Sequence, residues 1–177
     1  MRILLLLSLL TLSACVWQPA AYDEATAARV EAARATFAAR EQLTPFFNDA
    51  IAYAVFPAQW RAGTGFGGAF GTGWLFEGGQ VTGRAVMVEA FVGANLGLQV
   101  YRKILFFRSE TALDQFKRGR FEFTGQANMA HVVGGKAATP GYHPDAAMFV
   151  EVKGGLLLEV SVGSQRYDYF PLLQAQR

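Results

Sequence analysis

Cysteine, histidine and net charge are all scarce in this sequence, and each scarcity argues against a class of protein. The chain has one cysteine, so no disulfide can form within it. Its two histidines, His131 and His143, lie apart in the sequence without a cysteine partner, and they make a weak metal site. Basic and acidic side chains number 16 and 14, a balance that argues against a general nucleic-acid binder.

Signatures of catalysis are also lacking. There is no Gly-x-Ser-x-Gly sequence, so a lipase reaction has no nucleophile signature. Glu89 and Glu151 could meet across a sheet, but any β protein offers pairs of this kind. We therefore expect no enzymatic activity and no cofactor.

The N-terminal segment predicts export and lipid modification. Arg2 precedes an apolar run from Ile3 to Leu12, which is too short to span a bilayer and has the length of a secretory signal. The run ends in Leu-Ser-Ala-Cys at 12–15, which matches the lipobox of bacterial lipoproteins. This resemblance implies that residues 1–14 are removed as a signal peptide and that Cys15 is acylated. An ordinary secretory signal with a chance cysteine is the alternative.

Similarity to sorted lipoproteins also implies a location in the cell envelope. Val16, rather than an aspartate, follows the cysteine, which favours an outer-membrane lipoprotein facing the periplasm. Residues 15–20 form the acylated cysteine and a short tether, which spans about 20 Å at roughly 3.5 Å per residue. The folded part is therefore expected to lie close to the lipid surface, with Trp17 at the headgroup level.

Residues 21–172 are expected to form a single domain, and 173–177 a C-terminal tail. The alanine-rich stretch Ala21–Leu43 contains neither glycine nor proline and predicts a helix. Thr44 and Pro45 are typical of an N-cap and the first helical residue, so a short helix should follow and end near Ile51.

Strand signals dominate the remainder. One strand is expected at Tyr53–Phe56, stopped by Pro57, and a short helix capped by Ser109 should bury Leu113 and Phe116. The other predicted strands are Gly65–Phe76, Gly83–Val92, Leu96–Tyr101, Ile104–Arg108, Phe121–Val133, Ala147–Lys153, Leu156–Val162 and Tyr167–Phe170. This order predicts an α+β fold, in which N-terminal helices pack on a strongly curved, mostly antiparallel sheet or partial barrel, with one further short helix between strands.

The run GTGFGGAFGTGW at 63–74 begins with the spacing of a dinucleotide-binding loop, at Gly63, Gly65 and Gly68. Such a loop needs a helix after it, whereas here Gly78-Gly79 and further strand signals follow, so the context is wrong. In a strand, alternate residues face opposite sides, which puts aromatic side chains on one face and small residues on the other. We interpret the run as a strongly curved strand. Its aromatic face should fill a core, and its bare face should receive a helix or a neighbouring sheet layer.

The ordered series of segments resembles the SYLF domain, whose eukaryotic members bind phosphoinositides and whose bacterial members are often exported lipoproteins. The resemblance rests on AIAYAVFP at 50–57 with the glycine-rich strand after it, GLQV at 97–100, the apolar strand Ile104–Phe107, the helix Ser109–Phe116, and KGGLLLEV at 153–160. It covers about 21–172 and implies an association with lipid. The region 80–84 departs from the family, which often has a tryptophan and a proline there.

A cluster of cations is the best electrostatic candidate for a lipid site. The predicted headgroup-binding residues are Arg102, Lys103, Arg108, Lys117, Arg118 and Arg120. Each cation near a charged membrane contributes about 1 kcal/mol, so the cluster could bind the phosphates of anionic lipids; a solvated edge with surface ion pairs is the alternative. We expect a membrane-anchored, non-catalytic lipid-binding domain. The competing hypothesis is an envelope protein that recruits a protein partner and touches the membrane only through its acyl anchor.

Overall fold

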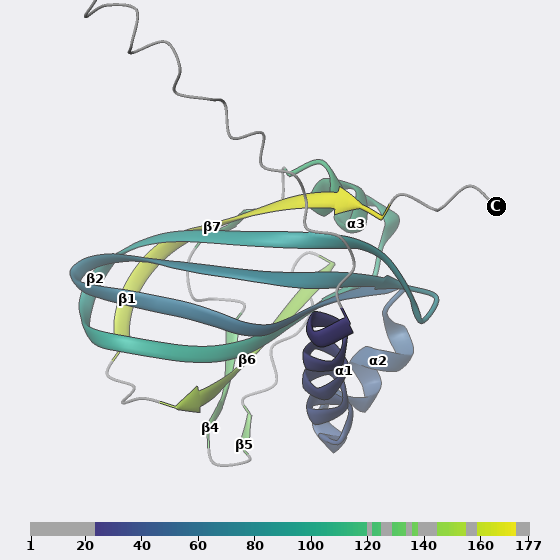
Figure 1. The fold of residues 1–177 in the computed structure, drawn as a ribbon, viewed down its shortest axis with the longest axis horizontal. Helices are drawn as coiled ribbons and strands as arrows, with labels where there is room; N and C mark the ends of the chain where they lie inside the picture. The colour runs from purple at the N-terminus through teal and green to yellow at the C-terminus, as the bar shows by residue number, and fades with distance from the viewer. Residues whose placement is uncertain are drawn as a thin grey trace, which may run out of the picture.

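The computed structural model describes residues 24–119, 122–124, 129–133, 136–137, 145–154 and 159–172. The predicted signal peptide, Cys15 with its tether, and the C-terminal tail lie outside these residues. The described part has an α+β fold, in which one mostly antiparallel sheet that does not close is accompanied by helices (Figure 1).

Within the described ranges, two α-helices and a 3-10 helix precede the sheet, and one further α-helix interrupts it. The elements are α1 (Glu24–Ala38), the 3-10 helix η1 (Glu41–Leu43), α2 (Thr44–Asp49) and α3 (Glu110–Lys117). Ser109 caps α3 by accepting a hydrogen bond from the backbone N–H of Ala112, as the sequence predicts. The predicted cap at Thr44 is wrong, because Thr44 is already helical and Leu43 occupies the N-cap position.

Among the residues that the structure describes, the sheet contains seven strands, and all of their pairs are antiparallel except β4 with β6. The strands are β1 (Ala52–Glu77), β2 (Gln80–Phe107), β3 (Glu122–Thr124), β4 (Met129–Val133), β5 (Lys136–Ala137), β6 (Ala146–Gly154) and β7 (Glu159–Pro171). β1 pairs with β2 along nearly its whole length. The opposite edge of β2 pairs first with β7 and then with β6.

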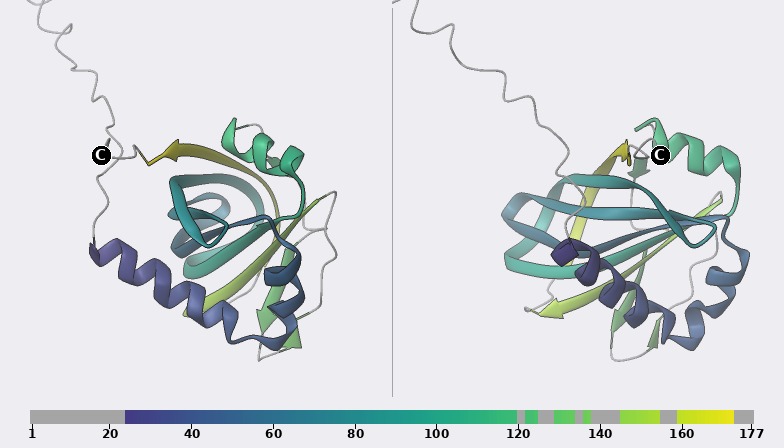
Figure 2. Two further views of the ribbon diagram at one scale, coloured as in Figure 1. Left: turned by 90° about the vertical axis from the view of Figure 1, so that its right-hand side faces the viewer. Right: turned by 45° about the vertical axis from the view of Figure 1, so that its right-hand side comes forward.

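The long β1–β2 hairpin bends back on itself, and we call the resulting U-shaped sheet the curl (Figures 1 and 2). The bend in β1 lies at a register shift between Thr64 and Phe66, where Gly65 has a φ of 73°, a conformation that favours glycine. It divides β1 into a first arm, Ala52–Thr64, and a second arm, Phe66–Glu77. The inner face of the sheet is the face inside this U, and the outer face is its opposite.

The two arms of β1 approach each other so closely that only glycine fits at several positions. A Cβ atom added to Gly73 would clash with the Val55 carbonyl oxygen and lie 2.7 Å from the Phe56 ring. One added to Gly71 would clash with the Gln59 side chain and lie 3.1 Å from the Ala58 carbonyl oxygen. The predicted bare face of the glycine run does receive a neighbouring layer, and that layer is the first arm of the same strand.

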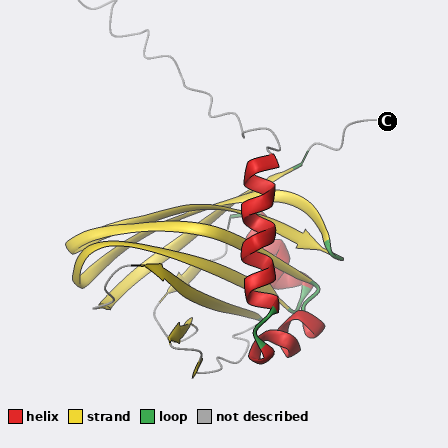
Figure 3. Cartoon of the chain, turned by 60° about the horizontal axis from the view of Figure 1, so that its bottom comes forward, coloured by secondary structure: helices red, strands yellow, loops and turns green. Residues whose placement is uncertain are grey.

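Apolar residues pack on both faces of the curl. On the inner face, Leu113 and Phe116 of α3 join residues such as Phe56, Leu75 and Leu105. On the outer face, α1 and α2 cover part of the sheet, where their buried residues meet a second apolar cluster of sheet residues, Val55, Trp74, Phe76, Ile104, Phe106, Ala147 and Phe149. Figure 3 shows α1 crossing the strands, and the left view of Figure 2 shows α3 on the opposite side of the curl from α1.

Three expectations about the strands are wrong. The separate strands predicted at Gly83–Val92, Leu96–Tyr101 and Ile104–Arg108 belong to one continuous strand, β2. Pro57 does not end a strand, because β1 passes through it at a register shift between Phe56 and Gln59, on an edge where a missing N–H costs no ladder bond. The aromatic face of the glycine-rich strand fills a core only in part. Trp74 and Phe76 are buried beneath the helices, whereas Phe66 and Phe70 are exposed.

The contact between the arms predicts a costly substitution. Gly73→Ala should lower the free energy of unfolding by about 1–3 kcal/mol, because the added methyl group meets backbone and a packed ring that cannot move away freely. Urea denaturation of the two proteins measures this difference. Gly68→Ala is the matched control, since Gly68 is exposed and its added Cβ would have one neighbour, the Glu89 carbonyl oxygen at 3.1 Å. An equal loss in both variants would contradict the close packing of the arms.

Candidate functional site: the outer patch and the polar interior of the curl

The structure does not gather the predicted headgroup-binding cations into one surface patch. Lys103 is fully buried on the inner face of the sheet, so the prediction that it contacts headgroups is wrong. It points inward because it occupies the same side of β2 as Tyr101 and Leu105, both of which are buried. Arg120 lies outside the described residues.

The other four predicted cations each contact a carboxylate. Arg102 lies 3.3 Å from Glu151, and Arg108 lies 3.0 Å from Asp145. Lys117 and Arg118 of α3 pair with Glu77 at 2.7 Å and Asp114 at 3.0 Å. These pairs correspond to the alternative interpretation of the cluster, a solvated edge with surface ion pairs, and they reduce the positive charge offered to a membrane.

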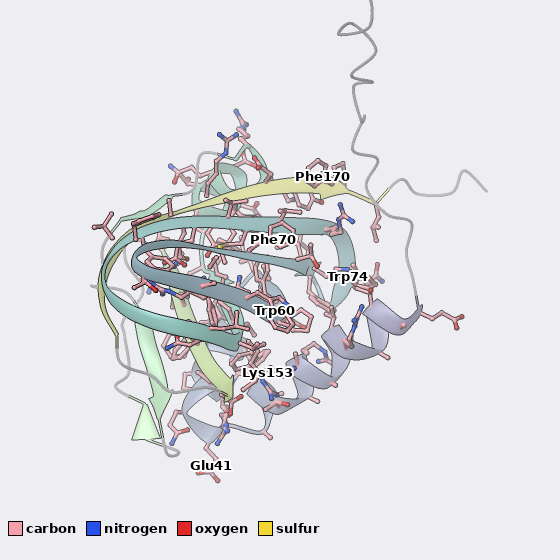
Figure 4. The ribbon with its side chains drawn as sticks, turned by 60° about the vertical axis from the view of Figure 1, so that its left-hand side comes forward. Glu41, Trp60, Phe70, Trp74, Lys153 and Phe170 are labelled. Atoms are coloured by element: carbon pink, nitrogen blue, oxygen red, sulfur yellow. The ribbon has the colours of Figure 1, made fainter. Side chains whose placement is uncertain are left out.

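The most unusual surface of the described chain is apolar. We call it the outer patch, and its residues, each at least 49% exposed, are Trp60, Phe66, Phe70, Val88, Val92 and Leu98. Phe66 lies directly opposite Val92, and Phe70 opposite Val88, so these four side chains form two cross-strand pairs. Figure 4 shows Trp60 of the first arm and Phe70 of the second arm on the same side of the curl, next to Trp74, with α1 lying below them.

Beneath the outer patch, the inner face of the same strands is polar. The buried polar residues there, none more than 7% exposed, are Gln59, Arg61, Glu89, Gln99, Lys103 and Gln165. Arg61 directly follows Trp60, and Glu89 directly follows Val88, so adjacent residues place an apolar side chain outside and a charged one inside. Soluble proteins normally show the opposite arrangement, so this part of the curl is inverted in polarity.

Lys103 connects the two halves of the curl through side chains of β7. Its ammonium group donates to Gln165 Oε1 at 2.8 Å and to the Tyr167 hydroxyl at 3.3 Å. Burial raises the pKa of Tyr167 well above its usual value, so the phenol stays protonated and donates to Gln165 Oε1 at 2.7 Å. These contacts satisfy polar groups that burial would otherwise make costly.

Glu89 forms the second half of the same network. Its carboxylate lies 3.5 Å from Arg61 Nη1 and accepts a hydrogen bond from Gln165 Nε2 at 3.2 Å. The Tyr101 hydroxyl lies 3.5 Å from Glu89 Oε2. Arg61 also stacks over the ring of Phe91, at 3.9 Å from its centroid. Gln165 joins the contacts of Glu89 to those of Lys103, so the inner face holds one continuous polar network.

The other sequence candidates do not converge on a site. Glu89 and Glu151 do not meet, because Glu89 faces the interior while Glu151 contacts Arg40 and Arg102. His143 lies outside the described residues, and the side chain of His131 is not described. Within the described ranges, no group of three histidine, cysteine, aspartate or glutamate residues is arranged to hold a metal, and no helix is long and apolar enough to cross a membrane.

Comparison with known proteins finds no family model that matches the chain, and no curated protein matches it. The resemblance to the SYLF domain therefore stays a prediction from the sequence.

The outer patch was missed by sequence reasoning although a signal for it is present. In Gln59-Trp60-Arg61-Ala62, apolar and polar residues alternate, as in a strand with one buried face. Alternation alone does not say which face is buried, and the default interpretation puts the aromatic residues inside. Only the close approach of the β1 arms shows that the inner face takes the polar residues here.

The polar network of the inner face predicts that removal of the Glu89 carboxylate strongly destabilises the folded protein. Glu89→Ala should reduce the free energy of unfolding by about 3–5 kcal/mol, because it leaves the buried Arg61 guanidinium without this counter-charge. Urea denaturation measures the loss. Glu110→Ala, an exposed glutamate in the first turn of α3, is the control and should cost about 0.5 kcal/mol. A loss at Glu89 as small as the loss at Glu110 would show that the network contributes little.

Proposed function

We propose that this protein is a membrane-anchored, non-catalytic lipid-binding domain, which contacts the bilayer through the outer patch. The inverted polarity of the curl is the observation that carries the proposal. An apolar outer face above a buried polar inner face is favourable where the surrounding medium is itself apolar, and it is unfavourable in water.

The energetics of the outer patch suit an interfacial contact. Complete burial of one large apolar side chain contributes about 1.5–3 kcal/mol, so a few partly inserted side chains give a weak, reversible attachment. Trp60, Phe66 and Phe70 are aromatic, and tryptophan in particular is common at the boundary between headgroups and acyl chains. Such an attachment becomes effective when an anchor already holds the domain at the membrane.

The predicted anchor is compatible with this placement. Nine peptide units separate Cys15 from Glu24, where α1 begins, and they span at most about 30 Å. α1 lies along the outer face of the curl, where its buried residues contact the cluster around Trp74. An acylated Cys15 would therefore keep the outer face within reach of the same lipid surface.

Two exposed cations beside the outer patch replace the predicted basic cluster as contacts for anionic headgroups. Arg166 of β7 pairs with Val88 in the sheet register and is highly exposed, although it also contacts Asp168. Lys153 of β6 is also exposed. The next residue, Gly154, pairs with Val100 of β2, and Val100 in turn pairs with Trp60, so Lys153 lies close to the outer patch. Each such cation adds about 1 kcal/mol at an anionic membrane.

Vesicle binding of residues 16–177, which lack the acyl anchor, tests the proposal. Phe66→Ser combined with Phe70→Ser should weaken co-sedimentation with anionic phospholipid vesicles about 30-fold, which corresponds to a loss of about 2 kcal/mol of apolar burial. Both side chains are exposed, so the folded structure should persist.

Two controls accompany this measurement. Ile51→Ser changes an exposed apolar residue immediately before β1, outside the outer patch, and should leave vesicle binding unchanged. Charge reversal at Lys117, Arg118 and Arg120 tests the original prediction, and we expect it to have little effect because Lys117 and Arg118 already contact carboxylates. Equal binding of the wild type and the Phe66/Phe70 variant would refute the membrane contact.

Recruitment of a protein partner is the competing function, because an exposed apolar patch also suits a protein interface. A photo-crosslinking residue at position 66 in the full chain separates the two in cells. Crosslinks to lipid support the proposed function. Crosslinks to one protein, together with absent vesicle binding, would assign the outer patch to that partner.

A further inference from the structure

Gln59 is the one buried amide of the described inner face that shows no hydrogen-bond partner on either of its side-chain atoms. The residue is fully buried, and both Nε2 and Oε1 are unpartnered. An amide removed from water without new hydrogen bonds costs several kcal/mol, so buried polar groups in proteins are nearly always satisfied by protein or by a bound molecule.

The surroundings of Gln59 are polar and are built from both arms of β1. Tyr101 lies directly opposite it in the register of β1 and β2, and Arg61 follows two residues later on the same face. Gly71 of the second arm faces its side chain, since a Cβ atom there would clash with Gln59 Cγ. The glycine therefore leaves room for the glutamine, and the network around Glu89 begins at its cross-strand neighbour Tyr101.

We propose that Gln59 binds a hydroxyl-bearing guest inside the curl, either water or a polyol. The amide presents a donor and an acceptor, and a hydroxyl group can accept from the first and donate to the second. A simple anion would satisfy only Nε2, and a simple cation only Oε1. A buried water typically makes about three hydrogen bonds, so the two Gln59 side-chain atoms would supply most of what such a guest needs.

The inference concerns the inner face and does not depend on what covers the outer patch. It gives a reason for the polar inner face of the curl, whereas the proposed function gives a reason for the apolar outer face. A polar guest would link the arm that carries Gln59 to the network that spans the curl.

A crystal structure of the full chain at high resolution, together with native mass spectrometry, tests the inference and separates the two sources of the hydroxyl. For water, we expect ordered density within about 3.2 Å of both Gln59 side-chain atoms and no added mass. For a polyol, we expect density of matching shape at the same place and a retained mass that disappears in Gln59→Leu. An interior without density at both atoms and without added mass overturns the inference.

The melting temperature of the Gln59→Leu variant tests the inference independently, because the direction of its change depends on whether a guest is bound. If a guest is bound, the leucine removes its hydrogen bonds, and the melting temperature should fall by about 4 °C. If the amide is dry, the leucine removes a buried unsatisfied group, and the melting temperature should rise, which would count against the inference. Gln115→Leu, at an exposed position of α3, is the matched control and should leave the melting temperature nearly unchanged.

Discussion

The close approach of the two arms of β1 is the contact on which the rest of the structure depends. Gly71 and Gly73 allow the backbone of one arm to lie against the other, and a side chain at either position would hold the arms apart. Because β2, β6 and β7 pair outward from β1, the bend of this one strand sets the curvature of most of the sheet. The network around Lys103 and Glu89 then joins the two halves from within.

This curvature divides the sheet into two regions of different character. In one region both faces are covered, by α3 inside and by α1 and α2 outside, and apolar residues fill both sides. In the other region the inner face is polar and the outer patch is uncovered. The proposed membrane contact and the proposed guest at Gln59 both come from this second region, on opposite faces of the same strands.

Much of the architecture could be predicted from sequence because local signals carry it. Ser109 caps α3, Leu113 and Phe116 are buried, and the small-residue face of the glycine run packs against another layer. The continuity of β1 through Pro57 could not be predicted, because it depends on a register shift on an edge strand. The burial of Lys103 could not be predicted because it also depends on residues remote in sequence. A lysine is expected at the surface by default, and here Gln165 and Tyr167 of β7 supply the partners that allow its burial.

The sequence by itself determined the α+β class, the capped helix α3 and the need for a bent, glycine-rich strand, since each of these follows from neighbouring residues. The sequence also carries the prediction of a lipidated Cys15. Only the tertiary structure decided which face of the bent strand is inside, and so which aromatic residues are exposed and which charges are buried. Strand periodicity is the same for either face, and the choice is made by contacts between β1 arms and between β2 and β7, which are remote in sequence.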